Sequence, residues 1–157
     1  LGAIGRRVEN QLAAFTDVGL LKRAPESPPT EPAVAPSDER PRRVAPHDYT
    51  QPLEQRARSY LDINCAHCHR LGGVGGRTQF QMIESLPLAR TGLINGTPLV
   101  PLLGPDARVV APGAPERSEL LHRLLLKEGG RMPLIGGEKT DDEGVDLIRR
   151  WIASMVP

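Results

Sequence analysis

The chain is poor in aromatic residues: its 157 residues include two Phe, two Tyr and one Trp. Aromatic side chains supply much of the buried area of a protein core, so a core made of protein alone lacks its usual material here. A buried flat apolar group would supply the missing surface. We therefore expect a non-protein component in the interior.

Two other features are also lacking. The 20 basic and 19 acidic residues leave a formal charge of +1, so no overall field points to nucleic acid or to an anionic membrane. No apolar run approaches the roughly 18 residues that a membrane-spanning helix needs. The length is typical of one compact domain with an appendage.

Cysteine is scarce, and its two copies lie together in the run Cys65-Ala66-His67-Cys68-His69. The C-x-x-C-H pattern is the attachment motif of c-type haem. The two thiols form thioethers with the two vinyl groups of the porphyrin, and the imidazole of the following histidine binds the iron. The motif therefore predicts one covalent haem c on Cys65 and Cys68, with His69 as an iron ligand.

Three other chemistries use closely spaced cysteines. A thioredoxin-like dithiol needs the pair at the start of a helix within a βαβ unit, whereas the segment before Cys65 has a helical pattern. A structural zinc site needs four ligands, and His47 and His122 are isolated in the sequence. A disulfide between Cys65 and Cys68 would close a very small loop and stabilise little. Haem attachment is the favoured interpretation.

Composition divides the chain into three zones. An apolar stripe at helical spacing predicts an N-terminal helical segment within residues 1–24. The stretch from Pro25 to Pro46 contains seven prolines and few large apolar residues, which predicts a linker or surface strap over 25–49. Residues 50–157 are expected to form a small helical domain.

Helix signals in this domain occur at three places. Thr50 and Pro52 mark the start of a helix that continues to Asn64 and delivers the cysteines. Pro115 is suited to the first position of a second helix, which we expect to end at Gly129-Gly130. Thr140 and Glu143 form a capping box for the last helix, whose apolar side is predicted to contain Val145, Ile148, Trp151, Ile152 and Met155.

The segments between these helices are expected to be irregular. Leu71 to Gly76 is too rich in glycine for a helix or strand and suits a loop passing close to a ligand. Residues 78–114 contain scattered apolar residues and the turn signals Asn95-Gly96 and Pro112-Gly113, so we expect mostly loop there.

The sixth ligand of the iron has four candidates. Met132 lies in the loop Gly-Gly-Arg-Met-Pro-Leu, where a thioether can project without disturbing a helix, and Pro133 stiffens it. Met155 is placed on a helix face suited to the core. Met82 follows His69 by few residues for a chain that must pass around the porphyrin edge. His122 lies in a leucine-rich helix. We favour Met132.

Several phrases together resemble a class I c-type cytochrome domain. They are Tyr60-Leu61-Asp-Ile-Asn64 before the motif, Val110-Ala-Pro-Gly-Ala-Pro-Glu-Arg-Ser118, Arg131-Met132-Pro133, and Val145-Asp-Leu-Ile-Arg-Arg-Trp151-Ile152. More narrowly, they are similar to the monohaem domain that closes longer secreted bacterial proteins, some fused to a quinoprotein-type sugar dehydrogenase. The similarity covers about residues 50 to 156, and the linker and the 78–109 segment are longer than in a minimal cytochrome.

The resemblance implies an all-α fold: a small helical bundle around one haem, with an irregular N-terminal extension. The helix before the motif is expected to cross the last helix, with Tyr60 near Trp151. Arg77, Arg108 and Arg131 are candidate partners for the haem propionates, Arg131 foremost because it precedes Met132.

The expected function is one-electron transfer with His69 and Met132 as axial ligands, between a redox enzyme or complex and another carrier, without catalysis by the domain itself. The alternatives are a haem-based sensor with an open or displaceable sixth site, and a docking module whose haem is structural. Because haem c is attached outside the bacterial cytoplasm, we expect an exported, periplasmic or otherwise extracytoplasmic protein whose leader is absent from this sequence.

Overall fold

The structure is a computed structural model that describes residues 18–20, 43–75, 77–136 and 139–156. Contacts divide the chain after Arg42, and Arg43 to Pro157 form one compact unit. The predicted N-terminal helical segment (1–24) and proline-rich linker (25–49) lie outside the described residues, except for 18–20 and 43–49. The compact unit contains the whole of the cysteine motif.

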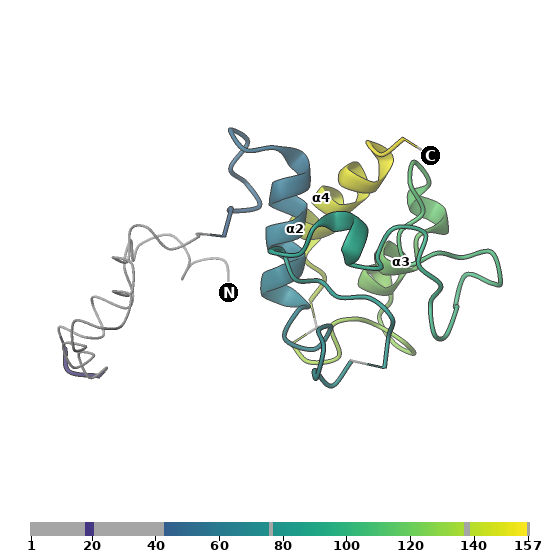
Figure 1. Cartoon of the computed structure of the whole chain (residues 1–157), viewed down its shortest axis with the longest axis horizontal. Helices are drawn as coiled ribbons and strands as arrows, with labels where there is room; N and C mark the ends of the chain where they lie inside the picture. Colours follow the sequence, from purple (N-terminus) through teal and green to yellow (C-terminus); the bar gives the residue numbers. More distant parts are fainter. Residues whose placement is uncertain (1–17, 21–42, 76, 137–138, 157) are drawn as a thin grey trace. The chain divides into compact units, whose positions relative to one another are not determined.

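Three helices form the frame of this unit: α2 (Leu53–Asn64), α3 (Glu119–Leu125) and α4 (Asp142–Ala153). Two short 3-10 turns, η2 (Leu88–Arg90) and η3 (Pro115–Arg117), interrupt the long loops between them (Figure 1). The described residues contain no strand, only two isolated bridges that pair Ile94 with Val110 and Arg108 with Ser118. The described part thus consists of helices joined by irregular segments, as the sequence predicts.

Helix α2 has the predicted bounds. Pro52 precedes its first turn, and Ala57, Tyr60 and Leu61 are buried on one side. The helix ends at Asn64, and Cys65 closes its last turn by donating a backbone hydrogen bond to Leu61 O. The first cysteine of the motif is therefore fixed directly to the end of a buried helix.

Helix α4 begins one residue later than the capping box predicts. The N-cap is Asp141, whose Oδ1 accepts a hydrogen bond of 3.0 Å from Gly144 N. The expected cap, Thr140, lies outside the helix. A carboxylate at this position also interacts favourably with the positive end of the helix dipole, which explains why Asp141 takes the role.

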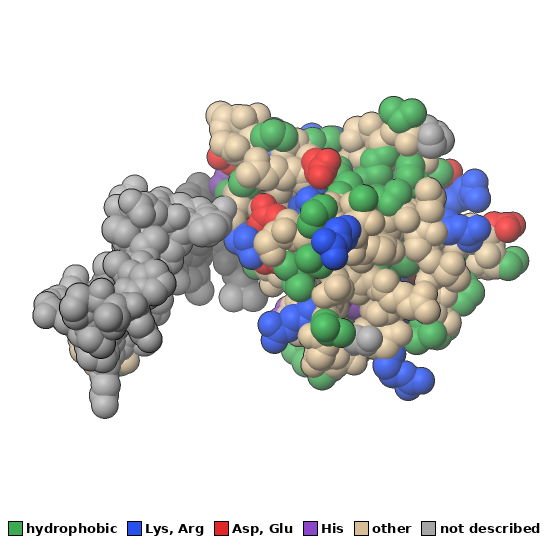
Figure 2. Space-filling view, viewed as in Figure 1, with side chains coloured by type: hydrophobic (Ala, Val, Ile, Leu, Met, Phe, Trp, Pro, Cys, Tyr) green, Lys and Arg blue, Asp and Glu red, His purple; other side chains and the backbone are tan. Residues whose placement is uncertain are grey.

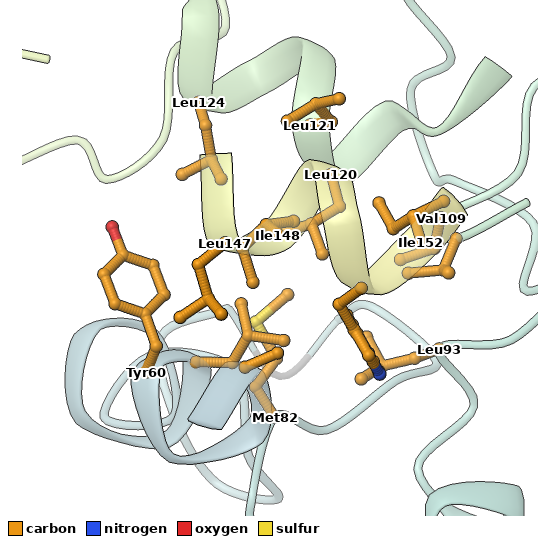
Figure 3. Close-up of a cluster of buried hydrophobic side chains, with 14 of the residues drawn as sticks. Tyr60, Met82, Leu93, Val109, Leu120, Leu121, Leu124, Leu147, Ile148 and Ile152 are labelled. Atoms are coloured by element: carbon orange, nitrogen blue, oxygen red, sulfur yellow. The ribbon is translucent and has the colours of Figure 1, made fainter. Parts of the chain in front are cut away.

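The buried side of α4 packs on α2 and α3 (Figure 3). Val145, Ile148, Trp151 and Ile152 are buried as predicted, and Met155 packs at the edge of this core. Leu147 is buried as well. None of the described helices is long and apolar enough to cross a membrane.

The contact of Tyr60 with α4 lies at Gly144. A Cβ at Gly144 would overlap the phenol ring of Tyr60, so glycine is the residue that allows α2 to approach so closely. Gly144 precedes Trp151 by about two helical turns, and Tyr60 and Trp151 belong to the same buried cluster. Burial raises the pKa of Tyr60, with a smaller contribution from the nearby Asp141 carboxylate.

The predicted helix from Pro115 to Gly129 is wrong in its continuity and its end. Pro115 opens only the 3-10 turn η3, and Ser118 is extended. The Ser118 hydroxyl binds Ala111 N at 2.9 Å and Ala114 O at 3.0 Å, which holds the chain out of helical geometry. Helix α3 then ends at Leu125, because Leu126 is again extended.

Residues 43–49, assigned to the linker in the sequence, pack on α2. Val44 N donates to Ser59 Oγ at 3.0 Å, and Arg43 pairs with Asp62 at 2.7 Å. The guanidinium of Arg56 lies 4.3 Å from the ring centre of Tyr49. The compact unit therefore begins several residues before the predicted boundary at 50.

The face of the compact unit seen in Figure 2 carries basic, acidic and apolar side chains. Large apolar residues are exposed mainly in the loops, among them Leu71, Val74, Leu134 and Ile135. Charges of both signs are interspersed on this face, in keeping with the nearly balanced composition of the chain.

The N-cap assignment leads to a test with a matched control. Replacing Asp141 by Ala leaves Gly144 N without its acceptor and should lower the free energy of unfolding by about 1 kcal/mol. The neighbouring Thr140→Ala change should have a much smaller effect, because Thr140 caps nothing. Chemical denaturation of both variants measures this difference. A larger loss of stability in Thr140→Ala than in Asp141→Ala would show that Thr140, as the capping box predicts, is the N-cap.

Candidate functional site

The cysteine motif forms a tight turn at the end of α2. His69 N donates to Cys65 O at 2.8 Å, and Cys68 N donates to the same oxygen at 3.1 Å. Cys65 and Cys68 are free and half-buried, whereas His67 is exposed. The turn thus brings two thiols and the His69 imidazole to the end of one helix.

Next to this turn lies a cavity of about 190 Å³. Its wall brings together the first cysteine, the motif histidine and the methionine of the distant 129–136 loop. The lining residues are Cys65, His69, Thr78, Phe80, Met82, Pro98, Leu99, Val100, Val109, Glu119, Leu120, Arg123, Leu124 and Met132. Most are apolar, and the sulfur and nitrogen atoms of Cys65, His69, Met82 and Met132 are also in the wall.

His69 is oriented by two neighbours. Its ring stacks on Phe80 with 5.0 Å between ring centres, and its Nδ1 lies 3.3 Å from Thr78 Oγ1. The Thr78 hydroxyl donates to Gly75 O at 2.7 Å, so it accepts from Nδ1–H, and Nε2 keeps the free lone pair. Nε2 is then the atom available to bind a metal.

The pKa of His69 lies below its ordinary value. Burial is the main cause, and the nearby charges of His67 and Arg123 add to it. A lowered pKa favours the neutral imidazole, which is the form that binds iron. The environment of His69 therefore favours the neutral imidazole, the protonation state that a metal ligand needs.

The Cys65 thiol argues against a redox dithiol. Burial, with a smaller effect of Cys68, raises the pKa of Cys65 to about 12. Thiol–disulfide enzymes need a lowered pKa because the thiolate is the nucleophile. A zinc site also lacks support, because the described residues contain no group of three or more His, Cys, Asp or Glu side chains placed to hold a metal ion.

The glycine-rich loop after the motif lies against its backbone. A Cβ at Gly73 would overlap Cys68 O, and one at Gly75 would lie 3.0 Å from His69 Nδ1 and 3.1 Å from Cys68 O. These two glycines let the loop lie directly against the motif turn. The predicted approach of this backbone to a ligand stays a prediction.

The candidates for the sixth ligand lie in different places. Met132 lines the cavity, and so does Met82. Met82 is buried in the core, and its backbone N donates to His69 O at 2.9 Å, which ties it to the histidine. Met155 packs on the core, and His122 lines a separate hollow beside Leu125 and Arg149. Met132 and Met82 are therefore the candidates that share the cavity with His69.

The predicted propionate partners do not line the cavity. Arg131 lines a neighbouring hollow formed by the 127–136 loop, and its Nε is buried without a hydrogen-bond partner among the described residues. A buried unpartnered donor next to Met132 is the feature that an external carboxylate would satisfy. Arg77 is exposed, and Arg108 donates to the neighbouring Ala107 O.

Sequence reasoning missed two charged residues of the cavity wall, Glu119 and Arg123. They form an ion pair of 3.0 Å one turn apart on α3, and Glu119 is only 3% exposed. Their i, i+4 spacing was available in the sequence, but it is typical of ordinary surface pairs. Burial, which distinguishes this pair, depends on the loops that cover it.

Comparison with known proteins found no counterpart. No protein-family model, no curated protein and no solved structure matches this chain. The resemblance to class I cytochromes therefore stays a prediction from the sequence phrases quoted above.

Gly75 offers a test of the motif's surroundings. A methyl group at this position would press on the His69 ring and on Cys68 O, so Gly75→Ala should lower the free energy of unfolding by about 1 to 3 kcal/mol. Val74 is 90% exposed, and Val74→Ala should change the free energy of unfolding by less than about 0.5 kcal/mol. Thermal or chemical unfolding compares the two. Equal stability of both variants would contradict the close packing at Gly75.

Proposed function

We propose that this protein is a one-electron carrier with one covalently attached haem c. The observation that supports it most is the cavity, which gathers Cys65, His69 and Met132 from two distant parts of the chain around an apolar wall. An imidazole and a thioether are the iron ligands of a His/Met cytochrome, and a cysteine thiol is the group through which haem c is attached. The few aromatic residues are in keeping with an interior completed by a porphyrin.

Each residue has a distinct role in this proposal. Cys65 and Cys68 hold the haem covalently, and the Nε2 of His69 binds the iron. Met132 from the 129–136 loop would supply a second ligand to the iron, and Arg131 would pair with a propionate. The bound haem supplies reversible one-electron chemistry, and the methionine sulfur favours its reduced form.

The surroundings of the cavity fit a carrier. Most residues of its wall are apolar, and a haem iron bound by both His69 and Met132 would have no open position for oxygen. We propose an exported protein, periplasmic or otherwise extracytoplasmic, that exchanges electrons with a redox donor and acceptor, alone or as part of a larger redox assembly.

The absorption spectrum tests this function directly. The protein, expressed with haem-attachment machinery, should give a pyridine haemochrome spectrum of haem c and a low-spin spectrum in both oxidation states. The oxidised form should also show the weak sulfur-to-iron charge-transfer band. A high-spin, gas-binding spectrum would instead support the sensor with an open sixth site. Absence of covalent haem would refute both.

The two methionines of the cavity form a matched pair for the ligand assignment. Met132→Leu should abolish the sulfur-to-iron band and lower the reduction potential, because the thioether favours ferrous iron. Met82→Leu keeps the volume of a buried core residue and should leave the band in place. Both are measured by spectroscopy and potentiometry on holoprotein. Loss of the band in Met82→Leu alone would move the ligand to Met82.

A further inference from the structure

Two loops of the cavity wall are held by the same pair of charged side chains. The first loop spans residues 98–103 and contributes Pro98, Leu99 and Val100 to the cavity. The second spans 129–136 and contributes Met132. The pair is Glu119 and Arg123 at the start and the end of α3.

Glu119 binds the first loop through its carboxylate. Leu102 N donates to it at 3.0 and 3.1 Å, and Leu103 N donates at 3.3 Å. With the ion pair to Arg123, the charge of this buried carboxylate is compensated and its oxygens have partners. Within the described part of the chain, every hydrogen bond of residues 98–103 is made to Glu119 or Arg123.

Arg123 binds both loops. Its Nη2 donates to Val100 O at 2.6 Å, its Nη1 donates to Gly130 O at 2.9 Å, and its Nε faces Glu119 at 3.0 Å. Its own carbonyl accepts a hydrogen bond from Met132 N at 3.1 Å. The side chain thus fixes the chain two residues before Met132, and the backbone fixes Met132 itself.

This arrangement separates the roles of two neighbouring arginines. All three guanidinium nitrogens of Arg123 have acceptors within the protein, so the residue is committed to the loops. The buried Nε of Arg131 has none in the described residues. Arg131 is therefore the candidate for an external carboxylate, and Arg123 the candidate for a fixed structural link.

We propose that Arg123, held by the buried carboxylate of Glu119, is a positioning residue that sets the Met132 thioether for iron binding and couples it to the 98–103 loop. This inference rests on the proposed His69/Met132 ligation. A planar guanidinium can serve three acceptors in a fixed fork, which an ammonium cannot. A ligand held loosely by its support loses part of its occupancy to competing ligands.

The test measures how readily an external ligand displaces the methionine. Imidazole is titrated into the oxidised holoprotein and followed in the visible spectrum and in the sulfur-to-iron band. In Arg123→Gln the dissociation constant for imidazole should fall at least about tenfold, because several hydrogen bonds to a charged group are lost. The band should weaken, while the covalent haem content stays that of the wild type.

Arg58 provides the matched control. It is a similarly half-buried arginine that donates to Glu84 O at 2.7 Å and lies outside the cavity wall. Arg58→Gln should lower the overall stability and leave the imidazole affinity unchanged. Equal imidazole affinities in the wild type and Arg123→Gln, or an equal gain in Arg58→Gln, would overturn the positioning role.

A second variant keeps the test decisive if Arg123→Gln does not fold. Glu119→Gln keeps the shape and an acceptor but removes the charge that holds Arg123, and it should also raise the imidazole affinity. An unchanged affinity in this variant overturns the inference. The wild-type spectrum separates the two proposals. If the wild type lacks the sulfur-to-iron band, methionine ligation itself is refuted. If the wild type shows the band and Arg123→Gln and Glu119→Gln both retain it unchanged, only the positioning role is refuted.

Discussion

The contact between α2 and α4 is the constraint on which the rest of the compact unit depends. Gly144 allows the Tyr60 ring to lie directly on the first turn of α4, and burial of both helices fixes the direction of α2. Because Cys65 continues the last turn of α2 through its bond to Leu61 O, the position of the motif follows from that packing. A rigid helix end positions the two cysteines more exactly than a free loop would.

The long irregular segments are held by isolated backbone–backbone hydrogen bonds, such as Val110 N to Leu93 O at 3.1 Å, and by side chains that bind backbone atoms. Arg58 donates to Glu84 O, Glu119 accepts from Leu102 N, and Ser118 binds Ala111 N. Since a buried backbone group without a partner costs free energy, these polar side chains satisfy backbone groups that the backbone–backbone bonds leave unpaired. This explains how a unit with three short helices and five aromatic residues in the whole chain keeps a defined cavity.

The sequence predicted the parts of the fold that depend on local patterns. Helix α2 and the apolar side of α4 follow from helical periodicity, and the loop character of 78–114 follows from turn residues. The break at Ser118 was missed because it depends on a bond to Ala111, which no local pattern contains. For the site, the motif predicted Cys65, Cys68 and His69. Met132 was predicted because it lies in an irregular loop between two helices. The roles of Glu119 and Arg123 require knowledge of which loops cover α3.

The polar groups of the cavity wall are already committed to other partners, which bears on the kind of chemistry the site supports. Thr78 is shared between Gly75 O and His69, Glu119 binds two backbone amides and an arginine, and Arg123 binds two carbonyls. The groups that remain toward the cavity are the His69 imidazole, the thioethers of Met82 and Met132, and the Cys65 thiol. Imidazole and thioether are iron ligands in His/Met haem sites, and the thiols of a C-x-x-C-H motif are the groups used for haem attachment. This arrangement agrees with the proposed carrier, in which the protein would hold a redox group and the group would supply the chemistry.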